Sequence, residues 1–317
     1  METRVALRGF VFAFMTATGL LGNILVLLAY FLIAHQQKKL VPAEIILLAL
    51  ALTNLVYDIT LAFPHTVFIF QVKYLVSDSD CKFDLYMARV SRALSICLTS
   101  LLSSCQCAAL ASRRWRYFRL NSQKHLFLGV FLLLFVSMVS SMSTAFFARA
   151  SGNSTNLNYV FDLGYCLVIY RDKTSFHLVG FVAFARDFIF VVIMTISSTH
   201  ILWILYRHAK QVRGIRGSDR MRQDSAESQA AKLVVTLVLV YVLIFGIDNG
   251  LWFYQFTLRR GDEILTDVNH LLSTVYASVF PVVVLTFNRK VRSNLLRCLG
   301  GEADQSLISS SLSEGKC

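Results

Sequence analysis

Two arginines in an apolar part of the chain have the types and spacing for anion chemistry. Arg89 and Arg92 follow Cys81 and precede a long run of apolar and small residues. At ~1.5 Å of rise per residue they lie about 12 and 16 Å into a helix that needs roughly 30 Å to cross a bilayer. Their spacing of three places them on one helix face, and a charge at the bilayer centre costs about 2.5 to 3.5 kcal/mol on insertion scales. We therefore expect this face to border a protein interior or a water-filled cavity.

Paired guanidinium groups in such a cavity can bind a carboxylate, sulfate or phosphate through bidentate hydrogen bonds. The ligand would then be a small organic anion. Internal ion pairing is the alternative, because buried charges are usually paired. Aspartates in the apolar segments supply four partners: Asp58, Asp84, Asp187 and Asp248. We expect Arg89 or Arg92 to bind the ligand, and Arg186 to pair with an acid such as Asp248.

Aromatic and polar side chains of other segments complete the expected cavity, since small-ligand sites combine apolar walls with a few polar groups. Any single aromatic residue is equally explained by packing or lipid contact. The remaining ligand-binding candidates are Tyr86, His65, Phe184, Asp248, Trp252, His270 and Tyr276. His65 and His270 lie on distant segments, where hydrogen bonding is the usual role of a lone histidine. We expect no metal and no cofactor.

The composition indicates that a membrane must surround these residues. Of the 317 residues, 56% are hydrophobic, and the mean hydropathy is +0.58. This is too apolar for a soluble globule, and the apolar runs lack the alternation of barrel strands. We predict an all-α membrane protein: a seven-transmembrane helix bundle over residues 7–287, after a short extracellular segment, 1–6. The spans cover about 7–33, 42–70, 81–112, 125–148, 175–206, 230–257 and 264–287.

The basic residues predict the orientation of this bundle. The net charge is +12, but the charges fall in short connections and so indicate topology, with no nucleic acid as a partner. Twice as many lysines and arginines lie on one side as on the other, which places the N-terminus outside the cell and the tail in the cytoplasm. On the outer side, Asn153 begins a glycosylation sequon. Cys81 and Cys166 lie there too, and in an oxidising compartment we expect them to form a disulfide; two free thiols are the alternative.

The residues after the last span are expected on the cytoplasmic side. Apolar and basic residues divide between two faces over 288–299, which predicts a short amphipathic helix lying on the inner leaflet. Cys298 is either a palmitoylation site or a free thiol. Residues 300–317 are polar and Ser-rich and are expected to be disordered.

These features resemble the rhodopsin-like G-protein-coupled receptors. The likeness rests on seven spans, Gly22-Asn23 in the first, the Cys81 and Cys166 pair, and Pro281 followed by an amphipathic helix. Several patterns of that superfamily are absent. Residues 105–107 stand where Asp-Arg-Tyr is usual, Asn54 replaces an aspartate of span two, residues 280–284 lack the Asn-Pro-x-x-Tyr pattern, and span six has no proline.

These losses, together with residues 48–54 and 97–106, resemble the vomeronasal type 1 receptors and, more closely, their olfactory receptor class A-like relatives. The resemblance covers about residues 7–299. It implies a chemosensory receptor for pheromones or odorants in the plasma membrane, which binds a small molecule and activates an inhibitory-type heterotrimeric G protein. Charges at the cytoplasmic end would contact that G protein, or they only set topology and meet anionic lipids. The G-protein-facing candidates are Gln106, Arg113, Arg114, Arg116, Arg213 and Arg216.

Three other functions are compatible with parts of the sequence. Bitter-taste receptors share several of the same losses. An intramembrane aspartyl protease would use Asp58 and Asp248 as two carboxylates that share a proton. A transporter would show internal repeats and helices broken near the midplane, which this sequence lacks. The receptor interpretation makes the chain a binding protein and not an enzyme.

Overall fold

The computed structural model describes residues 2–37, 40–70, 77–111, 123–150, 160–212, 218–257 and 263–296. Seven helical segments within them are long and apolar enough to cross a membrane, which confirms the predicted all-α bundle. The helices are α1 (Glu2–Gln37), α2 (Pro42–Tyr57), α3 (Phe63–Ile69), α4 (Asp78–Ala111), α6 (Gln123–Phe147), α7 (Lys173–Val212), α8 (Ser218–Thr257) and α9 (Glu263–Phe287). A π-helical turn, η1 (Asp58–Ala62), joins α2 to α3, so these three form one span.

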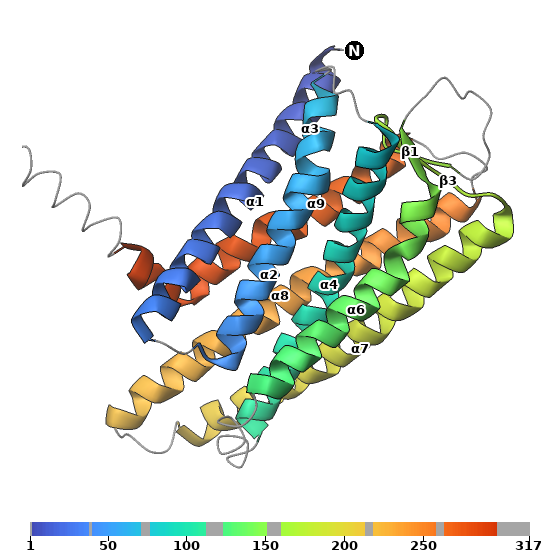
Figure 1. Ribbon diagram of the computed structural model, residues 1–317. Helices are drawn as coiled ribbons and strands as arrows, with labels where there is room; N and C mark the ends of the chain where they lie inside the picture. Colours follow the sequence, from blue (N-terminus) through green and yellow to red (C-terminus); the bar gives the residue numbers. More distant parts are fainter. Residues whose placement is uncertain are drawn as a thin grey trace, which may run out of the picture.

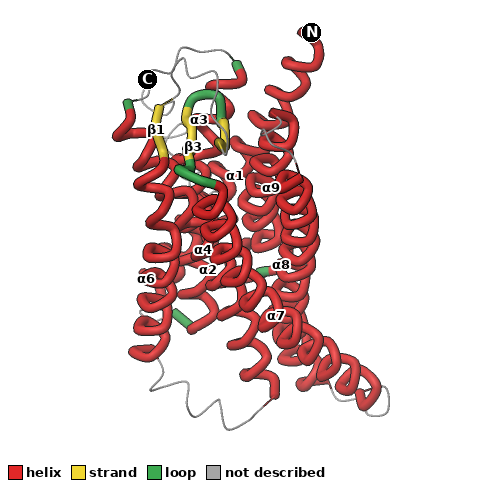
Figure 2. The backbone as a smooth tube through the Cα atoms, turned by 90° about the vertical axis from the view of Figure 1, so that its right-hand side faces the viewer, coloured by secondary structure: helices red, strands yellow, loops and turns green. Residues whose placement is uncertain are grey.

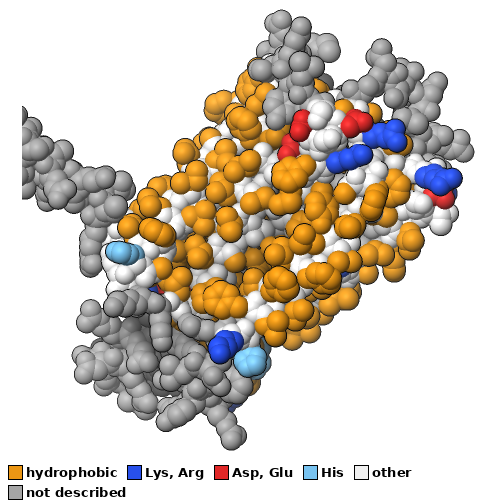
Figure 3. Space-filling model, in the orientation of Figure 1, with side chains coloured by type: hydrophobic (Ala, Val, Ile, Leu, Met, Phe, Trp, Pro, Cys, Tyr) orange, Lys and Arg blue, Asp and Glu red, His pale blue; other side chains and the backbone are white. Residues whose placement is uncertain are grey.

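The surface has the distribution of side chains that a bilayer requires. Apolar side chains cover the middle of the face in Figure 3, and the charged side chains lie toward its two ends. Helix α6 has large apolar residues such as Phe131 and Phe135 more than half exposed. Lipid contact explains this exposure, because lipid tails solvate apolar side chains that water would not.

Helix α4 is the central element, packed against α2, α6, α7 and α8 (Figures 1 and 2). Small polar side chains fasten it to its neighbours within the apolar core. The Ser95 hydroxyl donates to Asn54 Oδ1 at 3.1 Å, and the Thr99 and Tyr276 hydroxyls are 2.7 Å apart. Buried polar groups need such partners where no water is available. The small residues of α4 therefore allow close helix packing and also supply hydrogen bonds.

The proline in the second span coincides with a change of helix type. Pro64 has no backbone N–H to donate to the preceding turn, and the π-helical turn η1 ends at Ala62, two residues earlier. Asp58 begins this turn with its side chain fully buried, and Asn23 Nδ2 of α1 donates to Asp58 Oδ2 at 3.3 Å. The altered turn thus lies where α1 and the second span make a polar contact.

A small sheet covers one end of the bundle, which we call the hairpin end. It consists of β1 (Ala148–Ala150), β2 (Val160–Asp162) and β3 (Cys166–Ile169), antiparallel in the order β1-β3-β2. The start of α1 lies at the same end (Figure 2). Gly164, between β2 and β3, has φ +84°, and an added Cβ would overlap the Phe68 ring. Glycine is required there because other residues rarely adopt this φ.

A disulfide joins Cys81 to Cys166, with 5.8 Å between the two Cα atoms, so the alternative of two free thiols is wrong. The bond ties β3 to the beginning of α4, and both cysteines are fully buried. The sequence predicted the bond but provided no expectation of strands. Three- and four-residue strands are too short to produce a recognisable alternating pattern.

At the opposite end, residues 289–296 form a short helix after α9. Lys290 Nζ contacts Glu44 Oε1 at 2.5 Å and Gln37 Oε1 at 2.7 Å, and Val291 is fully buried. These contacts fasten the short helix to α1 and α2. Residues 297–317, with Cys298 and the predicted disordered tail, lie outside the described residues.

Close packing of α1 on α9 gives a first prediction. A Cβ added to Gly22 would lie 2.6 Å from Pro281 Cγ, and neither the proline ring nor the two helices can yield easily. We expect Gly22→Ala to destabilise the protein by about 1 to 3 kcal/mol, the usual cost of overpacking. Thermal unfolding in detergent measures this. Gly129→Ala is the matched control, because a Cβ there meets nothing within 4 Å. Equal melting temperatures for the two variants would contradict the prediction.

Candidate ligand-binding cavity

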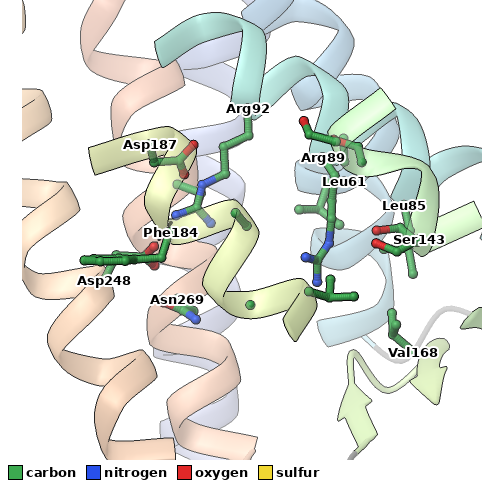
Figure 4. A pocket seen from close by; sticks show the side chains of 18 of the residues that line it. Leu61, Leu85, Arg89, Arg92, Ser143, Val168, Phe184, Asp187, Asp248 and Asn269 are labelled. Carbon is green, nitrogen blue, oxygen red and sulfur yellow. Dashed lines mark hydrogen bonds and ion pairs between the residues drawn. The ribbon is translucent and has the colours of Figure 1, made fainter. Parts of the chain in front are cut away.

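A cavity of about 190 Å³ lies inside the bundle, next to the sheet, and Figure 4 shows part of its lining. Its walls come from the second span and from α4, α6, α7, α8 and α9. Leu163, Val168 and Tyr170, from the sheet and its flanking residues, close the side toward the hairpin end. The disulfide holds this cover in place because Cys166 begins β3. The cavity is therefore built from nearly every element that α4 contacts.

Helix α4 contributes both predicted arginines to the cavity, and their environments differ. Arg92 Nη2 forms an ion pair with Asp248 Oδ2 of α8. Figure 4 shows the Arg92 side chain directed toward Asp187 and Asp248. Asp248 is only 9% exposed, and its Oδ1 has no partner among the described residues. Arg92 is thus the arginine engaged in internal pairing.

Arg186 pairs with an acid, as predicted, but this acid is Asp187 and not Asp248. Arg186 Nε and Nη2 each contact Oδ1 of Asp187, the next residue of α7, at 2.7 Å. Its Nη1 donates to Ser140 Oγ of α6 at 2.6 Å. Sequence spacing provided no reason to choose this pair, since adjacent residues of a helix do not usually face each other. Both side chains border the cavity, and the long arginine side chain contacts the Asp187 carboxylate there.

Arg89 does not take part in these ion pairs. It lines the cavity and makes no ion pair or hydrogen bond with any residue that the structure describes. In Figure 4 it stands apart from the Arg92 group, near Leu61. Among the lining residues, Arg89, Arg92 and Arg186 face two carboxylates, those of Asp187 and Asp248, so the wall carries one formal positive charge in excess. This imbalance favours an anionic occupant.

The other ligand-binding candidates divide into two groups. Phe184, Asp248 and His270 line the cavity. Three lie outside its lining, and each contacts another residue of the bundle. The Tyr86 hydroxyl donates to the Met138 carbonyl of α6 at 3.3 Å, and Tyr276 contacts Thr99. His65 is buried with its ring centroid 5.0 Å from that of His270. The Trp252 side chain lies outside the described part of the structure.

Several lining residues were missed by the sequence reasoning. Helix α6 supplies the hydroxyl groups of Ser140, Ser143 and Thr144, and α9 supplies Asn269. Thr144 Oγ1 and Asn269 Oδ1 are buried and have no partner among the described residues. A cluster of hydroxyl residues in an otherwise apolar span was the available signal. It was not used because serine and threonine can also donate to their own helix backbone.

The two aspartates of the protease hypothesis have different partners. Asp58 contacts Asn23 and is absent from the cavity lining, whereas Asp248 lines the cavity and pairs with Arg92. A shared proton between them has no support in this arrangement. The described residues also contain no group of three or more His, Cys, Asp or Glu side chains suited to a metal ion.

The candidates for contact with a G protein lie mostly beyond what the structure describes. Gln106 is half-buried in α4, near the end of the helix away from the hairpin. The other candidates for G-protein contact lie outside the described residues: Arg113, Arg114, Arg116, Arg213 and Arg216. The predicted glycosylation site, Asn153, also lies outside them.

The different environments of the two arginines predict different effects on stability. Arg92→Ala leaves Asp248 buried without its counterion. We therefore expect the free energy of unfolding to fall by about 1 to 3 kcal/mol or more. Arg89→Ala removes no ion pair or hydrogen bond with a described residue, so the melting temperature of this variant in detergent should stay close to that of the wild type. Equal destabilisation by the two substitutions would contradict this assignment.

Comparison with known proteins identifies the family. Residues 7–297 match the family described as the vomeronasal organ pheromone receptor family. The chain is 34% identical to olfactory receptor class A-like protein 1 of Danio rerio, with all of both chains covered. It is 26% identical to vomeronasal type-1 receptor 4 of Homo sapiens over 87% of this chain and 92% of that one. With seven membrane-spanning helices, an internal cavity and these relatives, the chain belongs to the vomeronasal organ pheromone receptor family of chemosensory, G-protein-coupled receptors.

Proposed function

We propose that this receptor detects a small organic anion that binds Arg89 in the cavity, and that it activates an inhibitory-type G protein. One observation carries the ligand class: Arg89 lines the cavity without an acidic partner among the described residues, whereas Arg92 and Arg186 are each paired. An unpaired guanidinium group offers a planar set of N–H donors that matches a carboxylate or sulfate. A cavity of about 190 Å³ limits the ligand to a small molecule.

The remaining lining residues support a ligand with both apolar and polar parts. Leu61, Leu85 and Phe184 offer apolar contacts. Thr144 Oγ1 and Asn269 Oδ1 are buried polar atoms without a described partner, so a polar group of the ligand could satisfy them. The ligand-binding roles of Tyr86, His65 and Tyr276 are not needed in this proposal, because these residues lie outside the lining.

The same proposal assigns the orientation and location of the receptor. The hairpin end faces outside the cell, in agreement with the excess of basic residues in the other connections and with the sequon at Asn153. Small molecules would then reach the cavity from outside the plasma membrane. The opposite end would meet the G protein, whose inhibitory type is taken from the resemblance to vomeronasal receptors.

The test is a G-protein activation assay in cells expressing the receptor, challenged with small acids, amines and neutral odorants. We expect responses to acids, and Arg89→Ala should raise the half-maximal concentration about 10- to 100-fold, since a hydrogen bond to a charged group contributes about 1.5 to 3 kcal/mol. Arg89→Lys should lose less, because it keeps the charge without the bidentate geometry. Lys82→Ala is the matched control, as this basic residue of α4 lies outside the cavity lining.

Two results would contradict the proposal. A response confined to amines would show that Arg89 does not select the ligand. An acid response unchanged in Arg89→Ala, with normal surface expression, would place the anion elsewhere. Co-expression with inhibitory-type or stimulatory-type α subunits tests the G protein separately, and a signal through stimulatory-type subunits alone would overturn that part.

A further inference from the structure

We propose that the Arg92–Asp248 ion pair is a latch that holds α8 against α4, and that the anion bound at Arg89 opens it by competing for Arg92. This inference rests on the proposed anion site. It adds a mechanism by which binding in the cavity changes the position of a helix. A ligand shifts a conformational equilibrium only if its own contacts differ between the two states, and an anion that binds Arg92 only after the latch opens meets this condition.

The positions of the two arginines make competition feasible. Arg89 and Arg92 are three residues apart on α4, a rise of roughly 4.5 Å, and both line the cavity. The Arg92 side chain is 37% exposed and that of Asp248 is 13% exposed, so the guanidinium group has room to reorient while the carboxylate is enclosed. An anion that binds Arg89 and extends across the cavity to Arg92 would therefore compete with Asp248 for the Arg92 guanidinium group.

The latch is the weaker of the two ion pairs in the cavity. Arg186 contacts Asp187 through two nitrogen atoms and Ser140 through a third, and its carboxylate partner lies on the same helix. Arg92 contacts Asp248 through one nitrogen and one oxygen, and Asp248 Oδ1 has no described partner. The pair that links two different helices is thus also the one with fewer contacts to lose.

The composition of α8 suits a helix that bends next to this latch. Its 40 residues, Ser218–Thr257, contain no proline, so the usual kink of a membrane helix is missing. Gly246 and Gly250 flank Asp248 in the sequence, both are exposed, and a Cβ at either position would meet nothing within 4 Å. Packing therefore does not require these glycines, and glycine makes a helix easier to deform than alanine does. Bending there would move the part of α8 between Ser218 and Gly246, which is about 40 Å long.

Ligand-independent signalling tests the latch. Asp248→Asn removes the ion pair with little change in shape, and basal nucleotide exchange on a co-expressed G protein should rise at least about fivefold, the lower end of typical coupling between two states. Asp267→Asn is the matched control. It breaks another interhelical ion pair, between Arg8 of α1 and Asp267 of α9, without touching α8, and should leave basal exchange unchanged.

Surface labelling shows whether each variant reaches the membrane. If Asp248→Asn is retained inside the cell, the double variant Arg92→Gln with Asp248→Asn contains no unpaired charge from the latch, and it should show the same rise in basal exchange. A basal exchange equal to that of the wild type in a surface-expressed variant would overturn the latch. The anion site is tested separately, by whether the response to acids depends on Arg89. Basal exchange involves no ligand, so failure of the latch and failure of the anion site give different results.

Stiffening the helix tests the bending point. Gly246→Ala with Gly250→Ala, placed in the Asp248→Asn background, should return basal exchange most of the way to the wild-type level, because the released helix can no longer bend easily. Gly129→Ala in the same background is the control, since that glycine of α6 also has open space at its Cβ position. Undiminished basal exchange after stiffening would show that α8 does not bend at these glycines.

Discussion

The cost of placing a charge in an apolar membrane is the constraint on which the rest of this structure depends. Each ionised side chain at bilayer depth must pair with an opposite charge, receive hydrogen bonds, or face water. The receptor meets this requirement in two ways along the same wall. Arg92 and Arg186 are paired with aspartates, while Arg89 borders the cavity without such a partner among the described residues. The two ion pairs and the position of Arg89 at the cavity both meet this electrostatic requirement.

Helix α4 turns this local requirement into an organising role for the fold. It contacts four other helices, begins at the disulfide with β3, and carries both Arg89 and Arg92 toward the cavity. Its small polar residues hydrogen bond to neighbouring spans. A change at the cavity is therefore next to α6, α7 and α8 at the same time. This proximity allows binding in the cavity and movement of a helix to be coupled within one bundle.

The departures from the usual rhodopsin-like motifs acquire a physical meaning in this arrangement. The chain lacks the charged triplet at the end of its third span and the proline of its sixth. It instead has an ion pair between these two spans at cavity depth and two exposed glycines beside the paired aspartate. A two-state bundle needs one contact that differs between its states and one place that deforms, and the sequence position of either is free to vary.

The sequence by itself determined the features that depend on local composition. Apolar runs longer than a bilayer is thick produce seven spans, and a three-residue spacing fixes Arg89 and Arg92 on one helix face. The sequence also predicted the Cys81–Cys166 disulfide, with two free thiols as the alternative. Tertiary structure decided which acid pairs with which base. Arg92 pairs with Asp248 and Arg186 with its neighbour Asp187, while Arg89 lines the cavity. It also moved Tyr86 and Tyr276 out of the lining. Such assignments depend on the rotation and depth of each helix relative to the others, which packing sets and local pattern does not encode.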